Sequence, residues 1–493
     1  MGINYFFDSK FKNLTNIMIH FLQKIFITLT LLTLTQKIYA QNLTISEPIN
    51  IFNAESYALS AKINDRFLFF YWHAELLTVN ALDNNLRNIW QKEINIEKKY
   101  EVKILDVIPN KISFNVIARM RKRNYTYIKV LKFDGQAKLL DSATVCSWKE
   151  SLNESETELF ISDDKRVVVA LNPNYYNENI TCAFSLDSLR PIWKVKWKSK
   201  NPDFDDRKQQ WLVTNDGKTF LFTDENSPSK KARQFDVLQF DTNQTVSDFK
   251  INTGEIIANN TLFNFDNKNK KLIAVGCYSN KNNGHNNGTF YLSIPENNTI
   301  QAHWQITPFT DEFVTSYIGK KVTDNKGVDD LKVQRIINRS DGGVVALIEK
   351  TRITERTTAG SNNTNTIIRN GHTYDFYCDN LFSLSLDSLG TKEWSQVYVK
   401  HQVSQDDDAR FSSFFIMRSP TSLRLIFNED VERNTNVYEY VIKNGGEVDR
   451  HVVLNTEAKD IYLRIRDAVQ FASNEILIPS EGNKSVKLVK ISW

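Results

Sequence analysis

The stretch ALDNNLRNIW, residues 81–90, decides the fold of this 493-residue chain. It combines the end of an apolar run, a Leu-Asp turn and a following strand that carries a tryptophan. The same pattern returns as LDSLRPIW at residues 186–193 and as LDSLGTKEW at residues 386–394. Asp and Asn suit such turns because their side chains bond to the nearby backbone. We expect each copy to join the last two strands of a repeating unit.

Weaker copies of this turn fill the spaces between the clear ones. The turn positions are 83, 134, 187, 241, 295, 387 and 444, so the intervals are 51, 53, 54, 54, 92 and 57 residues. Upstream of the turns lie further hairpin signals, such as TNDG at 214–217 between apolar runs. A period near 50 made of strands is typical of propeller blades with four strands each.

The expected number of blades follows from the long interval and from the C-terminal segment. We interpret the 92-residue interval as one blade with insertions at about 306–331, with room for a short helix, and about 352–372, where residues 354–371 form a low-complexity loop. The C-terminal segment offers only three strands, so residues 43–52 are expected to supply its outer strand. The prediction is an all-β fold: a single β-propeller over residues 41–493 with eight four-stranded blades, closed by N- and C-terminal strands in one blade. Seven blades are the alternative if the last segment is irregular.

The first forty residues have the features of a signal peptide. Lys10, Lys12 and Lys24 precede an apolar run at 25–34, and Ala40 offers a cleavage site before Gln41. A transmembrane anchor is the alternative, but the run is too short to span a bilayer of about 30 Å. We therefore expect an exported protein, periplasmic or extracellular or on the cell surface, with no membrane span after cleavage.

Composition narrows the function classes. The chain is 41% hydrophobic with a mean hydropathy of −0.41, which excludes both a disordered chain and a polytopic membrane protein. Removing residues 1–40 takes away four lysines and one aspartate, so the formal charge falls from +4 to +1. A near-neutral protein lacks the charge that nucleic-acid binding requires. Histidines show no paired metal-binding spacing, so no metal site and no cofactor are expected, and the protein is predicted to be a monomer.

Four cysteines lie after the signal peptide: Cys146, Cys182, Cys277 and Cys378. A protein with a large hydrophobic core does not need disulfide bonds for stability, and a free cysteine behaves as a small buried hydrophobe. We therefore expect buried, unpaired thiols. The alternative is a disulfide between Cys146 and Cys182, the closest pair in the sequence, since export leads to an oxidising compartment.

The Leu-Asp and tryptophan repeat resembles the quinoprotein-like propellers. The Thr-Gly that those proteins carry after the Asp is absent here, as are a vicinal cysteine pair and a haem motif, so a quinone cofactor is not expected. A closer resemblance is to uncharacterised secreted bacterial proteins predicted to be β-propellers. It rests on the segments at 271–278, 288–291, 341–349, 377–381, 400–407 and 425–429. This resemblance implies a propeller fold and export, and it brings no established activity.

Polar residues of those segments could converge at one face of the propeller. The candidate ligand-binding residues are Glu349, Tyr377, Asp379, Lys400, Gln402, Ser404, Asp407 and Asn428. The acidic run at 406–408 does not match a calcium-binding loop. The more ordinary interpretation is a loop in which ion pairs and hydrogen bonds are structural.

Function stays open between two classes. We favour a binding or scaffold module for a protein or glycan ligand, with the functional residues on loops at one face. The alternative is a propeller enzyme, a hydrolase or lyase, that acts on polysaccharide with carboxylates in its channel. The sequence selects no such pair of carboxylates, so a non-enzymatic role is preferred.

Overall fold

The computed structural model describes residues 41–60, 62–149, 156–173, 178–198, 209–225, 233–280, 285–296, 301–323, 327–358, 371–431 and 436–493. The chain divides into two compact units. Residues 44–490 form a ring of blades. The small second unit comprises residues 1–43 with 491–493, and its described residues are mostly strand. The predicted signal peptide at 1–40 lies outside the described residues.

Eight antiparallel sheets form the blades, numbered here in chain order. Blade 1 contains β3 (Ser56–Leu59), β4 (Phe67–His73), β5 (Leu76–Leu82) and β6 (Asn88–Asn95), and blade 2 contains β7 (Glu101–Pro109), β8 (Ser113–Lys122), β9 (Tyr125–Asp134) and β10 (Leu139–Lys149). Blade 3 contains β11 (Glu158–Ile161), β12 (Val167–Asn172), β13 (Asn179–Ser185) and β14 (Pro191–Trp197), and blade 4 contains β15 (Gln209–Val213), β16 (Thr219–Asp224), β17 (Gln234–Phe240) and β18 (Val246–Asn252).

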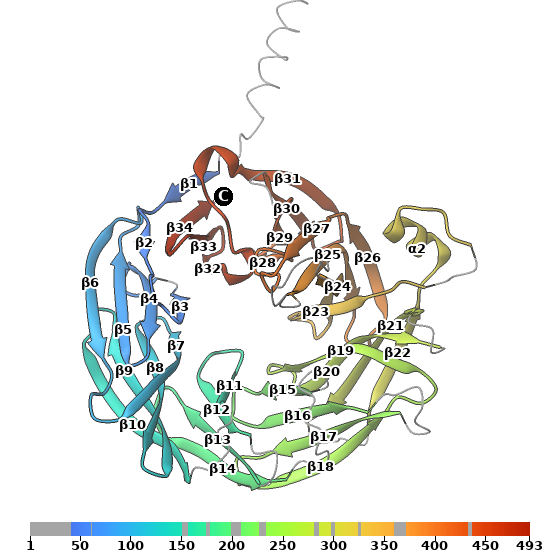
Figure 1. Cartoon of the computed structure of the whole chain (residues 1–493). Helices are drawn as coiled ribbons and strands as arrows, with labels where there is room; N and C mark the ends of the chain where they lie inside the picture. Colours follow the sequence, from blue (N-terminus) through green and yellow to red (C-terminus); the bar gives the residue numbers. More distant parts are fainter. Residues whose placement is uncertain are drawn as a thin grey trace, which may run out of the picture. The chain divides into compact units, whose positions relative to one another are not determined.

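The second half of the ring follows the same plan. Blade 5 contains β19 (Ile257–Asp266), β20 (Lys271–Ser279), β21 (Gly288–Pro295) and β22 (His303–Pro308), and blade 6 contains β23 (Leu331–Asn338), β24 (Val344–Thr358), β25 (Gly371–Leu386), β26 (Lys392–Tyr398) and β27 (Gln402–Gln405). Blade 7 contains β28 (Phe415–Arg418), β29 (Ser422–Asn428), β30 (Asn436–Lys443) and β31 (Val448–Asn455), and blade 8 contains β32 (Val469–Ala472), β33 (Glu475–Gly482), β34 (Ser485–Ser492), β1 (Asn42–Ile45) and β2 (Ile49–Asn50). Figure 1 shows the first strand of each blade innermost.

The two ends of the chain share blade 8, so the prediction of eight blades closed in this way is confirmed. Ser46 N donates to Leu488 O at 2.9 Å, and Leu488 N donates to Ser46 Oγ at 2.8 Å. β2 continues this pairing, with Ile49 opposite Val486. The N-terminal segment therefore covers the edge of β34 that would otherwise be open.

The repeated turn is the hairpin between the third and fourth strands of blades 1 to 7. In blade 1, Asp83 Oδ1 accepts hydrogen bonds from Asn85 N and Arg87 N, both at 2.8 Å, and Leu86 adopts a φ of 58°. In blade 6 the left-handed position is Gly390, with a φ of 80°. A Cβ there would lie 2.3 Å from the Tyr291 ring, so only glycine fits.

The core lies between the blades. Alternate side chains of each strand face the two neighbouring blades. In β5, for example, Leu77 and Val79 pack toward blade 2, whereas Leu82 packs toward blade 8. Flat aromatic contacts fill several interfaces, such as Phe222 on Phe263 with ring centroids 3.8 Å apart. Because every blade buries both faces, the ring can be stable without a separate core domain.

Blade 6 carries the extra residues of the long interval. A helix, α2 (Asp311–Ile318), precedes β23; Thr310 Oγ1 accepts from Phe313 N at its start, and Gly319 ends it with a φ of 74°. The expected loop at 354–371 is wrong at both ends, because β24 continues to Thr358 and β25 begins at Gly371. The threonine-rich alternation there favours paired strands, which a composition-based interpretation overlooks. No helix among the described residues is long and apolar enough to cross a membrane.

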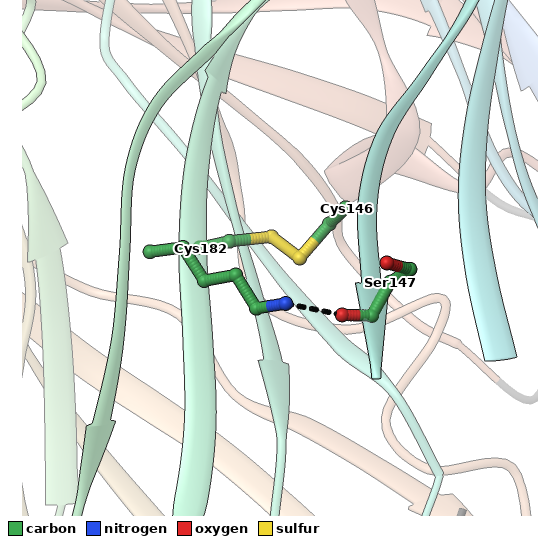
Figure 2. Close-up of a disulfide and its surroundings, with 4 residues drawn as sticks. Cys146, Ser147 and Cys182 are labelled. Atoms are coloured by element: carbon green, nitrogen blue, oxygen red, sulfur yellow. Dashed lines mark hydrogen bonds between the residues drawn. A yellow bond between two sulfur atoms is a disulfide. The ribbon is translucent and has the colours of Figure 1, made fainter. Parts of the chain in front are cut away.

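The expectation for the cysteines is half correct. Cys277 and Cys378 are free and buried, but Cys146 and Cys182 form a disulfide (Figure 2), so the prediction of unpaired thiols is wrong for that pair. Their Cα atoms lie 6.6 Å apart, on β10 of blade 2 and β13 of blade 3. Packing between neighbouring blades creates this proximity, which the spacing of 36 residues does not show.

Candidate functional site

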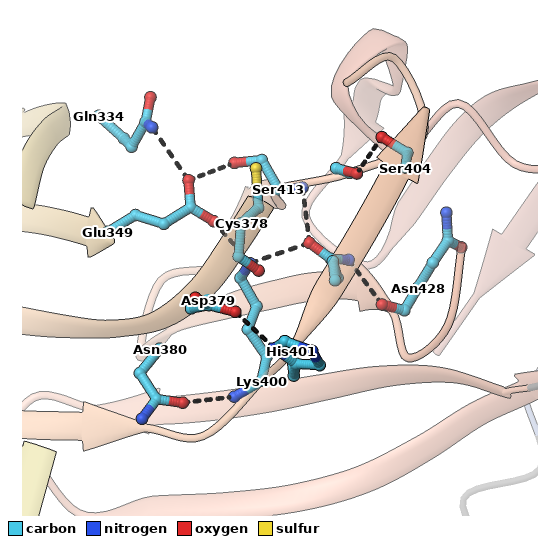
Figure 3. Close-up of polar contacts among 12 residues, drawn as sticks. Gln334, Glu349, Cys378, Asp379, Asn380, Lys400, His401, Ser404, Ser413 and Asn428 are labelled. Atoms are coloured by element: carbon cyan, nitrogen blue, oxygen red, sulfur yellow. Dashed lines mark hydrogen bonds and ion pairs between the residues drawn. The ribbon is translucent and has the colours of Figure 1, made fainter. Parts of the chain in front are cut away.

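Four of the eight predicted site residues form one connected polar network in blades 6 and 7. Glu349 lies on β24, Lys400 precedes β27, Gln402 begins β27, and Asn428 ends β29 (Figure 3). Their relative exposures are 0%, 5%, 1% and 8% in that order. The network is therefore buried in the wall of the ring.

A buried ion pair lies at the centre of this network. Lys400 Nζ approaches Glu349 Oε1 at 2.6 Å, and both side chains are fully buried. The two opposite charges therefore form a close ion pair. The ammonium also donates to Cys378 O at 2.7 Å and to Gln402 Oε1 at 2.9 Å. Such partners are needed because burying a charge without them is strongly unfavourable.

The remaining polar atoms of the network are bonded as well. Glu349 Oε2 accepts from Gln334 Nε2 at 2.9 Å and from Ser413 Oγ at 2.8 Å. Gln402 Oε1 accepts from Ser413 N at 2.7 Å, and its Nε2 donates to Asn428 O at 2.6 Å. The network thus ties the loop before β28 to blade 6.

The other four predicted residues lie beside the network. Ser404 Oγ donates to Asp407 Oδ1 at 2.7 Å and lies 3.3 Å from Ser412 Oγ. Asp379 and the exposed His401 form a separate pair at 2.5 Å.

Tyr377 lies under the guanidinium of Arg352, 4.5 Å from the ring centroid. Sequence reasoning grouped these eight residues from neighbouring segments, and the structure brings Glu349, Lys400, Gln402 and Asn428 into direct contact.

The contacts of this network are structural, because they fix the loop before β28 against blade 6. The buried polar atoms are engaged with one another and are covered by protein. Burial and the charge of Glu349 raise the pKa of Cys378 to about 11, so this thiol stays protonated and is no nucleophile at neutral pH. The ligand-binding role of the eight residues stays a prediction.

Three arginines that the sequence did not single out meet at the inner edge of blades 6, 7 and 8. Arg335 lies on β23, Arg418 ends β28, and Arg466 lies in the 3₁₀ helix Ile465–Asp467 before β32. All three side chains are exposed. Partial desolvation by the surrounding protein and the positive charges of Arg466 and Arg418 lower the pKa of Arg335. We call these residues the arginine triad.

The triad has no acidic partner among the described residues. The charges that act on Arg335 are both positive, and no carboxylate lies within 4 Å of any of the three guanidinium groups in the described part of the chain. Like charges held together repel, so the arrangement costs stability unless an anion lies between them. The signal in the sequence is an arginine at or near the first strand of three consecutive repeats.

A cavity of about 750 Å³ continues from the triad along the inner edge of blades 8 and 1. We call it the channel cavity. Its lining includes Arg410, Arg464, Arg466, Tyr57, Ser56, Glu55, Asp408, Asp467 and Glu481.

Within the cavity, two carboxylates are tied to Arg464. Asp467 lies 2.5 Å from its Nε, and Glu481 lies 2.7 Å from its NH1. Burial, together with those two carboxylates, raises the pKa of Tyr57, and the Tyr57 hydroxyl has no hydrogen-bond partner among the described residues. Tyr57 therefore keeps its proton at neutral pH, as a donor for a ligand.

The buried network contacts the strand that carries Arg335. Gln334, the neighbour of Arg335, occupies a β-bulge where β23 gains a residue against β24, and its amide bonds Glu349. Arg418 is fixed through its backbone, because its N donates to Gln470 Oε1 at 2.9 Å and its O accepts from Gln470 Nε2 at 2.6 Å. Bulges commonly redirect side chains beside functional sites.

Metal chemistry finds no support in this geometry. No group of three histidine, cysteine, aspartate or glutamate side chains in the described ranges could hold a metal ion.

Comparison with known proteins gives structural likenesses only. No protein-family model and no curated protein sequence matches the chain. Among solved structures, an uncharacterised protein from Listeria monocytogenes EGD-e has a TM-score of 0.38 at 10% identity, covering 78% of this chain and 90% of that one. A polysaccharide lyase, Uly1, has a TM-score of 0.36 at 10% identity, with coverages of 78% and 89%. A quinohemoprotein alcohol dehydrogenase from Pseudomonas putida HK5 has a TM-score of 0.38 at 9% identity, with coverages of 91% and 76%.

Proposed function

We propose that this propeller is an exported binding module whose ligand is an acidic glycan, held at the arginine triad and the channel cavity. The observation that carries the proposal is the convergence of Arg335, Arg418 and Arg466 from three consecutive blades without an acidic partner among the described residues. Guanidinium groups bind carboxylates and sulfates through paired hydrogen bonds. The cavity volume of about 750 Å³ lies within the usual range for small-ligand sites.

Binding is favoured over catalysis by the state of the groups in the cavity. Asp467 and Glu481 are held by Arg464, and Tyr57 keeps its proton because burial raises its pKa. A glycan hydrolase would need a carboxylate free to give or take a proton at the bond that breaks. The Cys146–Cys182 disulfide supports export, because such bonds persist in oxidising compartments.

The test is calorimetric titration with three tetrasaccharides: galacturonate-based, sulfated and uncharged glucose-based. We expect the two acidic sugars to bind and their affinity to fall as salt is raised. Arg418→Gln and Arg466→Gln should each weaken binding by about tenfold, the loss expected for a charge-assisted hydrogen bond. Both variants should unfold at the same or higher urea concentration than the wild type, since repulsion within the triad is relieved.

Arg450→Gln is the matched control. Arg450 lies on the outer strand β31, stacked on Tyr438 at 4.0 Å from the ring centroid, and its loss should leave binding unchanged. Failure of both acidic sugars to bind would overturn the proposal. Binding of hexaglutamate in place of the sugars would assign the site to an acidic protein segment instead.

A further inference from the structure

A second cavity lies on the opposite side of the N-terminal closing segment, between that segment and blade 1. Its volume is about 630 Å³. One wall is formed by residues 47–54, and the floor is formed by side chains of β4, β5 and β6. We call this cavity the closing groove.

The floor of the groove is a set of cross-strand rows that share one face of blade 1. Thr78 on β5 lies opposite Tyr71 on β4 and Glu93 on β6. One row further along, Asn80 lies opposite Gln91. Because side chains alternate along a strand, Thr78 and Asn80 face blade 8 together with Leu82, whereas Leu77 and Val79 face blade 2.

Asn80 departs from the pattern of the other blades. In blades 2 to 7 the third strand also presents two successive side chains to the preceding blade, and the counterparts of Leu82 are all buried and apolar. The counterparts of Asn80 are apolar or aromatic members of the inter-blade cores: Leu131, Cys182, Leu238, Leu292, Leu384 and Tyr440. Among blades 1 to 7, only blade 1 has an amide side chain at this third-strand position of the inter-blade core.

The amide of Asn80 is also unsatisfied. Its side chain is 3% exposed, and Nδ2 has no hydrogen-bond partner among the described residues. Leaving a buried donor unpaired costs about 1–3 kcal/mol, which folding alone would not select. A donor that lines a cavity can instead be satisfied by what enters the cavity.

The groove exists because the closing strand is interrupted. β1 ends at Ile45, the chain passes through Glu47 and Pro48, and β2 then pairs with β34 over only two residues. Proline has no N–H to continue the ladder, so the outer part of blade 8 is left without a regular fourth strand. The space beside blade 1 therefore stays open.

The lining selects an uncharged ligand with many hydroxyl groups. It offers the amides of Asn50, Asn53, Asn80, Asn88 and Gln91, which both donate and accept hydrogen bonds. Tyr71 and Phe52 add aromatic surface, and Phe52 is 56% exposed. No lysine or arginine belongs to the lining described, and its carboxylates, Glu47 and Glu93, disfavour an anion.

We propose that the closing groove is a binding site for a neutral oligosaccharide. The Asn80 amide, with Gln91 and Asn88 beside it, would bond the sugar hydroxyls, and the aromatic side chains would cover an apolar face of the ring. This site does not depend on the arginine triad, because it lies on other strands and has the opposite charge.

The test is calorimetric titration of the chain that begins at Gln41 with uncharged trisaccharides of glucose, mannose, galactose and N-acetylglucosamine, at millimolar concentration. We expect at least one of them to bind, and Asn80→Leu to weaken that binding by about tenfold or more. Asn80→Leu should also keep or raise the midpoint of urea unfolding, because leucine is the residue found at this position in most other blades.

Asn115→Leu is the matched control. Asn115 lies on β8, is 1% exposed and has its own unpartnered amide oxygen, but it does not line the groove. This variant should bind the trisaccharide as the wild type does. Gln91→Ala, at an exposed floor position, should weaken binding even if Asn80→Leu fails to fold.

Two results would overturn the inference: absence of binding for every uncharged trisaccharide, or unchanged binding by Asn80→Leu and Gln91→Ala. A preference for trilysine over all four sugars would also overturn it, in favour of a cationic ligand. Loss of acidic-glycan binding in the triad variants leaves this titration unaffected, so the two proposals fail separately.

Discussion

At the scale of single residues, the buried pair of Glu349 and Lys400 shows how a candidate site can be structural. Both charges are removed from water and are held by each other and by Gln334, Gln402 and Ser413. A complete buried pair adds little net stability, but removing one partner leaves an isolated buried charge. The pair therefore fixes the position of the loop before β28 more than it stabilises the fold.

Lys400→Met should lower the free energy of unfolding by about 3–5 kcal/mol, because the Glu349 carboxylate loses its counter-charge. Combining Lys400→Met with Glu349→Gln should recover much of that loss, since neither charge then remains. Urea denaturation measures both. Lys443→Met is the control: it breaks an exposed pair with Asp449 at 3.0 Å and should leave the free energy of unfolding almost unchanged. Equal losses for Lys400→Met and Lys443→Met would contradict this account.

At the scale of strands, the disulfide is a covalent link between two neighbouring blades. Cys146 belongs to the outermost strand of blade 2, and Cys182 belongs to the third strand of blade 3. Hydrogen bonds join the same two blades, such as that from Lys194 Nζ to Ser147 O. The bond lies within an apolar cluster that includes Val145, Trp148 and Phe184. The bond closes a loop of the chain across the boundary between the two blades, so it reduces the number of conformations open to the unfolded chain.

Reduction of this disulfide should destabilise the propeller by about 2–4 kcal/mol, because the unfolded chain regains the freedom of the closed loop. Urea denaturation with and without a phosphine reductant measures the change, with alkylation and mass analysis to verify that the bond is open. A Cys146→Ala, Cys182→Ala double variant should not respond to the reductant. An unchanged midpoint after verified reduction would contradict the prediction.

At the scale of the whole molecule, closure depends on residues that are far apart in the chain. The contacts of Ser46 with Leu488 and of Ile49 with Val486 join the first blade segment to the last. Without them, β34 would present a free edge, which favours pairing between molecules. The N-terminal segment also lines both the channel cavity and the closing groove, and Ala54 belongs to both linings.

A chain that begins at Phe52 should have a lower thermal midpoint than a chain that begins at Gln41, and it should self-associate as its concentration rises. The reason is that β1 and β2 no longer cover the edge of β34. Scanning fluorimetry and sedimentation velocity measure the two effects. Adding a peptide of residues 41–51 should reverse both, and identical behaviour of the two chains would disprove this role of the closing segment.

The sequence by itself determined the repeat: the Leu-Asp turns, their spacing near 50 residues and the missing outer strand predicted eight blades closed by both ends. Such features are local, because turn chemistry and strand alternation depend on neighbouring residues. It also grouped Glu349, Lys400, Gln402 and Asn428, which lie in contact because their segments belong to adjacent blades, while their role as a ligand site stays a prediction.

Only the tertiary structure decided which side chains are buried, which cysteines pair and where charges collect. The Cys146–Cys182 bond and the arginine triad depend on contacts between separate repeats. The unpaired amide of Asn80 indicates a ligand site only because the interrupted closing strand leaves a cavity beside it. Contacts of that kind follow from how the ring closes, which no local pattern specifies.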